Sequence, residues 1–338
     1  MPLQYVEKWS QLDLHNDSID SLSFSRDGYF LASGSMDGNV AISRGEDGTL
    51  LHLIRCRTPV LSLKWVRGRT HELWCGLGNG KEKLEVSCFT VHEYPIEHLA
   101  FDCTGTYLAT SAHAELKVFR HIASDRLQFL STIPPPRTVT IAPNQSTIIT
   151  SVHWLHKGRD ANCLVVTYLH HGIICWDPFS ATYHWTMPLG TLIGHADLHP
   201  DETRIAVMNQ HNGVDIWQVP AAILDCSLPL PARKGVLLPV LWIDNGVRIL
   251  TGSDVGEVRV WNPTTGKSLH PLPHPVEIVR AVTAHYDTQN HTFRIATGNA
   301  DTAEKAAAKT FYERKIVTTA GYLGVSVESS SRSLPLVP

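Results

Sequence analysis

The clearest pattern of hydrophobic and polar positions lies near the N-terminus. Phe24 is followed by a polar turn that contains Gly28, and an apolar segment with small residues begins at Leu31. The dipeptide Asp37-Gly38 comes next, and apolar and polar residues alternate after it. Asp-Gly favours tight hairpin turns, and alternation with a period of two is typical of β-strands. The pattern therefore predicts three strands that are joined by two tight turns.

The same spacing recurs along the chain. The apolar residue before the turn and the one after it are seven positions apart in four pairs: Phe24 and Leu31, Phe101 and Leu108, Leu198 and Ile205, and Trp242 and Ile249. A second interval of twelve positions leads to the end of the next strand in four pairs: Leu31 and Ser43, Leu164 and Trp176, Ile205 and Trp217, and Ile249 and Trp261. Two intervals that agree at scattered places indicate an internal repeat.

The repeat has about seven copies, and the spacing between them predicts the architecture. Their anchor residues are Leu31, Leu73, Leu108, Leu164, Ile205, Ile249 and Ile295. Successive anchors are 42, 35, 56, 41, 44 and 46 residues apart, and a four-stranded sheet every ~40–45 residues is the period of propeller blades. The longest interval contains 134–136, three prolines that cannot join a central strand because proline lacks a backbone N–H. We interpret it as a long connection between blades and not as a domain boundary.

Composition narrows the class of protein. The 338 residues are 43% hydrophobic and 18% charged, the latter below the ~25% of typical globular domains. No apolar run reaches the ~18 residues of a membrane span, and the first residues lack the basic and apolar regions of a secretory signal. The net charge of −3 argues against nucleic acid or an acidic membrane as the main partner. Seven cysteines without a CxxC pair favour reduced thiols, so we expect a cytoplasmic or nuclear protein.

From roughly residue 15 to residue 300 the chain resembles the WD-repeat β-propellers. The resemblance is strongest over 20–42, 198–218 and 246–262. The Trp-Asp dipeptide that names the family occurs at the expected place once, as Trp176-Asp177. The chain therefore resembles a divergent member of about seven repeats, and the resemblance implies a rigid ring of blades.

The family also has a Gly-His dipeptide before the first strand of a blade. The resemblance implies that its His bonds an Asp in the turn between the second and third strands, a Ser or Thr, and the Trp. His15 and His92 stand at this position, nine residues before their aromatic anchors, but Asp37 has no Trp to complete its set. Near His113 the Asp is missing, and Gly194-His195 is out of register. We therefore expect no blade to keep the whole network.

These observations predict an all-β, seven-bladed β-propeller of four-stranded antiparallel blades. The resemblance implies that a strand within residues 5–14 closes the ring as the outer strand of the last blade, which removes exposed sheet edges. We expect one propeller domain over 1–328, with a possible helical insertion at 303–314, where the composition is Ala-rich. The segment 329–338 is expected to be a flexible tail.

Motifs for catalysis or metal binding are weak. The glycine-rich run at 76–81 falls where the repeat places a hairpin turn, so it is not interpreted as a phosphate loop. No GxSxG motif occurs, and isolated carboxylates such as Asp37 and Asp254 lie where turns favour Asp. On a strand His195 and His199 would be ~13 Å apart, too far to share a zinc ion. We predict no catalytic residue, no metal site and no cofactor, although a site formed between blades stays open.

The resemblance implies a noncatalytic protein-interaction scaffold that binds other proteins or peptides as a monomeric propeller, and not nucleic acid or membrane. One face would be formed by the turns between the second and third strands and by the entries to each blade. The binding residues predicted on that face are Asp17, Met36, Tyr94, His113, Tyr168 and His211. The alternatives are a structural subunit of a fixed complex, and a propeller enzyme or small-ligand or metal binder that uses the central channel. The channel alternative requires several His and Asp residues that converge on one opening.

Overall fold

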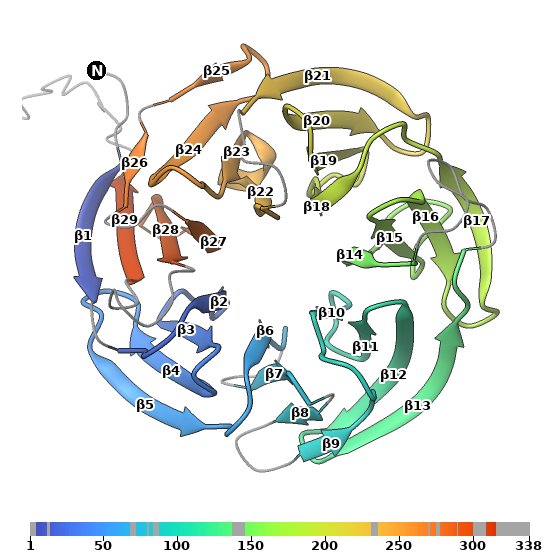
Figure 1. Ribbon diagram of the computed structural model, residues 1–338, viewed down its shortest axis with the longest axis horizontal. Helices are drawn as coiled ribbons and strands as arrows, with labels where there is room; N and C mark the ends of the chain where they lie inside the picture. The colour runs from blue at the N-terminus through green and yellow to red at the C-terminus, as the bar shows by residue number, and fades with distance from the viewer. Residues whose placement is uncertain are drawn as a thin grey trace, which may run out of the picture.

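The computed structural model describes residues 5–11, 14–67, 72–79, 81–83, 88–136, 146–230, 236–269, 271–274, 278–288, 290–299 and 309–315. In this part of the chain the strands group into seven sheets, which stand around a central channel (Figure 1). Every strand pair in these sheets is antiparallel. The prediction of an all-β propeller with four-stranded antiparallel blades is confirmed.

Six of the sheets are each made from consecutive strands, which run in order from the channel to the rim and are called a to d. The first three are β2 (Ile19–Phe24), β3 (Phe30–Ser35), β4 (Asn39–Arg44) and β5 (Leu50–Arg55); β6 (Val60–Trp65), β7 (Leu73–Leu77), β8 (Lys81–Lys83) and β9 (Cys88–Thr90); and β10 (His98–Phe101), β11 (Tyr107–Ala112), β12 (Glu115–Ala123) and β13 (Arg126–Ile133). In the glycine-rich run, residues 78 and 79 form a turn after β7, and residue 81 begins β8, which pairs antiparallel with β7.

The next three sheets follow the long connection that contains 134–136. They are β14 (Ile149–Trp154), β15 (Leu164–Tyr168), β16 (Gly172–Asp177) and β17 (Thr182–Met187); β18 (Ile193–Leu198), β19 (Arg204–Asn209), β20 (Gly213–Gln218) and β21 (Ile223–Pro229); and β22 (Val240–Ile243), β23 (Arg248–Thr251), β24 (Glu257–Asn262) and β25 (Lys267–Ser268). In the last of these sheets β26 (Leu272–Pro273) also pairs with β24, and the short 3-10 helix η1 (Asp244–Gly246) links β22 to β23.

The remaining sheet joins the two ends of the chain. Its inner strands are β27 (Val279–Asp287) and β28 (Thr292–Asn299), and its third strand is β29 (Lys309–Lys315). β1 (Val6–Gln11) pairs with β29 and is the outermost strand, so residue 6 lies opposite residue 313 (Figure 1).

The expectation of a helix over 303–314 is wrong for residues 309–315. This segment is a strand that pairs with β28 on one side and with β1 on the other. Helix propensity is a weak local preference, whereas two neighbouring strands satisfy the backbone N–H and C=O groups on both edges of the segment. The rest of the expected helix and the expected tail at 329–338 lie outside the described residues.

The strands alternate in character from the channel to the rim because neighbouring blades cover their faces. Strand b is apolar on both sides, and all five residues of β7 and of β15 are buried. Strand d is covered on one side only, so most of β17 is partly or fully exposed. Continuous apolar runs are expected where both faces of a strand are covered.

The histidine networks are incomplete, as expected, but one of them has a substitute acid. His15 Nε2 lies 2.8 Å from Ser33 Oγ, and its Nδ1 lies 3.4 Å from Asp37 Oδ2. His92 Nε2 lies 2.7 Å from the hydroxyl of Thr110, and its Nδ1 lies 2.6 Å from Glu115 Oε2. The longer Glu side chain reaches the histidine from the start of β12. The acid that was predicted to be missing near His113 is therefore replaced by a residue on the following strand.

Tyr5 connects the N-terminal segment to the sheet that begins with β22. Its side chain is buried beside apolar residues of that sheet, and its hydroxyl donates a hydrogen bond of 3.1 Å to Asp244 Oδ1. Arg248 Nη1 forms an ion pair with the other oxygen of the same carboxylate, 3.0 Å away. Burial raises the pKa of Asp244 to about 6, although Arg248 opposes the shift. A hydroxyl donor and a guanidinium charge thus compensate a poorly solvated carboxylate where the N-terminal segment meets a distant sheet.

Among the described residues, the structure has no helix that is both long and apolar enough to cross a membrane.

Replacing Tyr5 by Phe should lower the free energy of unfolding by about 1–2 kcal/mol, because a buried carboxylate loses its hydroxyl donor. Urea unfolding should show a lower midpoint with an unchanged slope. Tyr183→Phe is the matched control, since Tyr183 is 63% exposed, and it should change stability by less than about 0.5 kcal/mol. Equal effects of the two substitutions would contradict a role for the Tyr5 hydroxyl.

Candidate functional site

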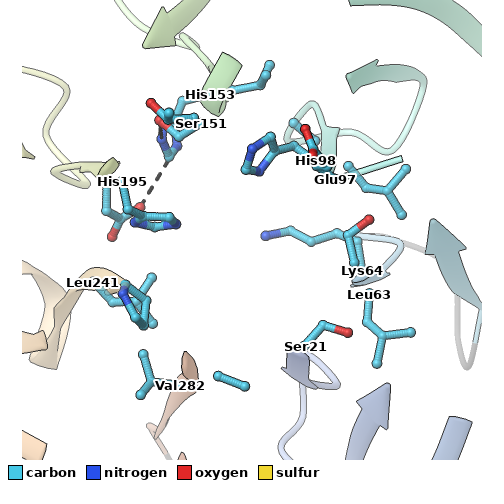
Figure 2. Close-up of a pocket in the computed structure, with 18 of the residues that line it drawn as sticks. Ser21, Leu63, Lys64, Glu97, His98, Ser151, His153, His195, Leu241 and Val282 are labelled. Carbon is cyan, nitrogen blue, oxygen red and sulfur yellow. Dashed lines mark hydrogen bonds and ion pairs between the residues drawn. The ribbon is translucent and has the colours of Figure 1, made fainter. Parts of the chain in front are cut away.

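The central channel is lined by the first strand of every blade. It forms a cavity of about 1070 Å³ whose walls include residues of β2, β6, β10, β14, β18, β22 and β27. Figure 2 shows charged and imidazole side chains that point toward its centre from four consecutive blades. The labelled ones are Lys64, His98, His153 and His195, and Asp197 lines the same cavity. They are called the channel cluster below.

The repeat explains why these residues face the channel together. Lys64, His153 and Asp197 are each the next-to-last residue of their strand a. His98 and His195 each stand three residues before the end of theirs, two positions earlier in the same register. Residues two apart on a strand point to the same side. The channel cluster therefore occupies two adjacent levels of the channel wall.

Backbone contacts fix the orientation of two imidazoles and the carboxylate. His153 Nε2 lies 3.0 Å from the carbonyl oxygen of Ala196, so this nitrogen carries the proton and donates it. The amide N–H of Val240 points at His195 Nδ1 at 3.3 Å, which leaves the proton of the neutral ring on Nε2. Asp197 Oδ2 accepts a hydrogen bond of 2.7 Å from the backbone N–H of Trp242.

The channel favours neutral imidazoles. Burial lowers the pKa of His98 and of His153 to about 4, because the enclosed wall solvates an imidazolium poorly. The pKa of His195 falls to about 3, first because of burial and then because His98 and His153 would add like charges. At neutral pH all three rings are therefore uncharged; His153 donates its N–H to Ala196, and His195 keeps an N–H at Nε2.

Lys64 and Asp197 are the opposite charges of the channel cluster. Burial raises the pKa of Asp197 to about 6, although the amide N–H of Trp242 and the charge of Lys64 oppose the shift. Burial also lowers the pKa of Lys64, and the charge of Arg67 adds to this effect while Asp197 opposes it. The Lys64 side chain is open to the channel, but the channel walls surround it, so it is less well solvated than a lysine on the outer surface.

The two ends of the channel differ in charge. At the end formed by the b–c turns, the lining includes the carboxylates of Asp17, Asp20 and Glu97 and one cation, Arg280. At the end formed by the a–b turns it includes Arg67, His156, His199 and Glu202. The Glu202 carboxylate already accepts hydrogen bonds from the backbone N–H groups of residues 156 and 157. The b–c end is therefore net acidic, and the a–b end carries a cation close to Lys64.

Five of the six predicted binding residues lie on the face of the b–c turns. Asp17 and Met36 line the mouth of the channel, and Met36 is 39% exposed. The rings of Tyr94 and His113 lie 5.7 Å apart on the entry and the b–c turn of one blade, and both side chains are exposed. His211 is exposed on the turn between β19 and β20, where its Nδ1 lies 3.4 Å from the hydroxyl of Thr191.

The prediction of Tyr168 as a surface contact is wrong. Its side chain is buried, and its hydroxyl accepts a hydrogen bond of 3.1 Å from Trp176 Nε1. It thus satisfies the indole of the sole Trp-Asp dipeptide at its expected place in the repeat. Tyr168 ends strand β15, so its side chain lies between blades rather than on the turn that follows.

The sequence analysis did not select the channel cluster. His195 was set aside because its dipeptide is out of register, and Lys64, His98 and Asp197 were not considered. A signal was available, since these residues stand one or three positions before the residue that ends strand a. Serine occupies the earlier position in three further blades, as Ser21, Ser62 and Ser151.

Neither a metal centre nor an activated thiol emerges from this arrangement. In the described part of the chain no three His, Cys, Asp or Glu side chains gather closely enough to hold a metal ion. Cys163 Sγ lies 3.6 Å from His184 Nδ1, but the same nitrogen is 2.9 Å from Asp160 Oδ1. Burial raises the pKa of the Cys163 thiol to about 11. A thiolate nucleophile needs a lowered pKa and a separate ring nitrogen, so this trio lacks the geometry of a nucleophilic site.

The substitution Asp197→Asn should increase the free energy of unfolding relative to the wild type, and this gain should grow as the pH rises. The folded pKa of about 6 exceeds the ordinary 3.8, so the wild-type protein loses stability as the pH rises through this window. The gain of the variant over the wild type should be about 1–3 kcal/mol larger at about pH 7.5 than at about pH 4.5, measured by urea unfolding.

Asp201→Asn is the control for this comparison. Its first influence is burial, which raises the pKa, but hydrogen bonds from Thr203 and His199 lower it overall to about 2. A lowered pKa stabilises the folded state above about pH 4, so the effect of this substitution should be nearly equal at both pH values. A pH-independent effect of Asp197→Asn would show that its carboxylate is well solvated.

The comparisons with known proteins agree with the architecture. Residues 5–68 match a family model described as the anaphase-promoting complex subunit 4 WD40 domain. This segment covers β1, the blade from β2 to β5, and β6. A search of curated proteins found no matching relative. The chain is therefore similar to a WD40 domain over residues 5–68, and its ring of four-stranded blades is the arrangement of a β-propeller.

Proposed function

We propose that the chain is a noncatalytic interaction scaffold: a monomeric, seven-bladed propeller, closed by β1, that captures a protein or peptide on the face of its b–c turns. WD-repeat propellers are commonly protein-interaction scaffolds. The matched model is named after a subunit of a complex, which supports a protein as partner. In this proposal the protein works in the cytoplasm or nucleus and binds neither nucleic acid nor membrane.

The observation that carries the proposal is a set of exposed apolar side chains on the face of the b–c turns, two of which, Met36 and Leu237, also line the channel. They belong to b–c turns and blade entries: Met36 is 39% exposed, Tyr94 55%, Leu237 41% and Val255 52%. Methionine and aromatic residues are enriched in the cores of interfaces, where they supply most of the binding energy. Rigid strands hold the loops that carry them, so the loops lose little conformational freedom on binding.

The charge of the mouth indicates the chemistry of the partner. Asp17, Asp20 and Glu97 outnumber the single cation Arg280 there. Complementary potentials favour encounter and suppress wrong partners. We therefore expect a segment that combines apolar residues with lysine or arginine.

Combined replacement of Met36, Tyr94, Leu237 and Val255 by Ser should abolish partner capture without unfolding the protein. Truncating the anchors of an interface removes several kcal/mol, so affinity should fall by at least about tenfold. The measurement is affinity capture from native extract with stepwise salt elution and mass spectrometry, followed by titration of the captured partner.

The matched control carries four serines on outer strands, at Leu50, Leu53, Ile223 and Leu224, which are 42–54% exposed. This variant should capture the same partner as the wild type. Loss of capture by the control, or its retention by the loop variant, would contradict the proposed face. Circular dichroism and urea unfolding establish that both variants are folded.

A further inference from the structure

Lys64 projects into the central channel without a partner of its own (Figure 2). Within the described residues, no hydrogen bond or ion pair joins its ammonium group to another side chain. Asp197 influences Lys64 only through space, and its carboxylate is engaged by the N–H of Trp242. Because an ammonium group has three donors and none of them is bonded to a described side chain, Lys64 can donate to an anion in the channel.

Neutral imidazoles beside Lys64 supply directed donors. His195 carries its proton on Nε2, because Nδ1 accepts from the backbone of Val240, and the ring stands in the channel opposite Lys64 (Figure 2). His98 lies on the neighbouring blade to Lys64 and also points inward. One ammonium group and neighbouring N–H donors suit the several acceptor oxygens of a small oxyanion.

The route into the channel favours a small anion. The b–c end is lined by three carboxylates, which repel an anion. The a–b end carries Arg67, three residues after Lys64 in the turn that follows β6. The cavity of about 1070 Å³ has room for a small molecule. Its wall is formed by hydrogen-bonded strands, so its width is fixed by the sheets. An anion therefore meets attractive charge from the a–b end and repulsive charge from the other end.

We propose that the central channel is a binding site for a small oxyanion of the sulfate or phosphate class, held by Lys64 and the N–H groups of His98 and His195. This site is independent of the loop face proposed above for a protein partner, because it shares no residue with it.

Binding at this site is coupled to protons. The channel cluster consists of Lys64 on β6, His98 on β10, His153 on β14, and His195 and Asp197 on β18. The other charged groups that line the channel near it are Asp20 on β2, Arg67 after β6, Glu97 before β10 and Arg280 on β27. Asp197 becomes neutral as the pH falls through about 6, which removes the negative charge that competes for Lys64. A bound anion also makes protonation of the three imidazoles less unfavourable, so both effects tighten binding at lower pH.

The test is calorimetric titration of the full chain with sodium sulfate at constant ionic strength, balanced with sodium chloride. Sulfate keeps its charge over the relevant pH range, so any pH dependence belongs to the protein. We expect one saturable site, with binding at least about threefold tighter at about pH 5.5 than at about pH 7.5. Lys64→Gln should weaken binding at least about tenfold.

Two further variants separate the site from general charge effects. Asp197→Asn should bind sulfate at pH 7.5 about as tightly as the wild type does at pH 5.5. Lys267→Gln, which removes an exposed lysine from β25 with the same change in net charge, should bind like the wild type. If Lys64→Gln does not fold, Lys64→Met keeps the length of the side chain and serves in its place.

A second titration distinguishes a free anion from a phosphate group on a partner, using inorganic phosphate and a short phosphoserine peptide as probes. Lys64-dependent binding of either probe supports the site, and the tighter probe identifies the source of the anion. Sulfate binding that is unchanged in Lys64→Gln, or the absence of saturable binding at both pH values, would overturn the proposal.

Discussion

Each blade has apolar side chains on both faces, so no blade can be stable without a neighbour on each side. The buried clusters reflect this directly, because they combine residues from adjacent sheets. One contains Ala32 and Val40 of one blade together with Val60 and Leu73 of the next. Another joins β2 and β3 to β27 and β28, across the place where the first blade meets the last. Burial of apolar surface thus depends on completing the ring, as in other repeat architectures.

The same constraint creates the channel and explains its polar character. The first strands of the seven sheets stand around the axis of the ring, and none of them crosses it, so a channel stays open at the centre. Side chains on strand a that point to the axis meet no neighbouring sheet, so apolar residues gain little there. Lys64, His153 and Asp197 occupy these positions, and neighbours one residue away, such as Leu63 and Trp154, pack between blades. A rigid wall with charged groups follows from the geometry of the ring.

Two sets of residues are available for recognition, and they have different physical character. The loop face exposes apolar side chains such as Tyr94 and Val255 around an acidic mouth, which suits a large and partly basic partner. The channel cluster is enclosed and offers one cation with imidazole donors, which suits a small ligand. The channel alternative that the sequence left open required His and Asp residues converging on one opening, and His98, His195 and Asp197 all line the channel.

The repeat spacing alone predicted the blades, because strands, turns and their period depend on local patterns of apolar residues and Asp-Gly turns, as at Asp37-Gly38. Local composition failed at residues 309–315, where pairing with β28 and β1 overrides helix propensity. Tyr168 was misplaced because one residue's shift along a strand exchanges a turn position for a buried one. Convergence of Lys64, His98, His195 and Asp197 was decided by the tertiary structure. These residues are far apart in the chain, and only closure of the sheets around an axis brings their side chains into one enclosed space, where burial sets their charge.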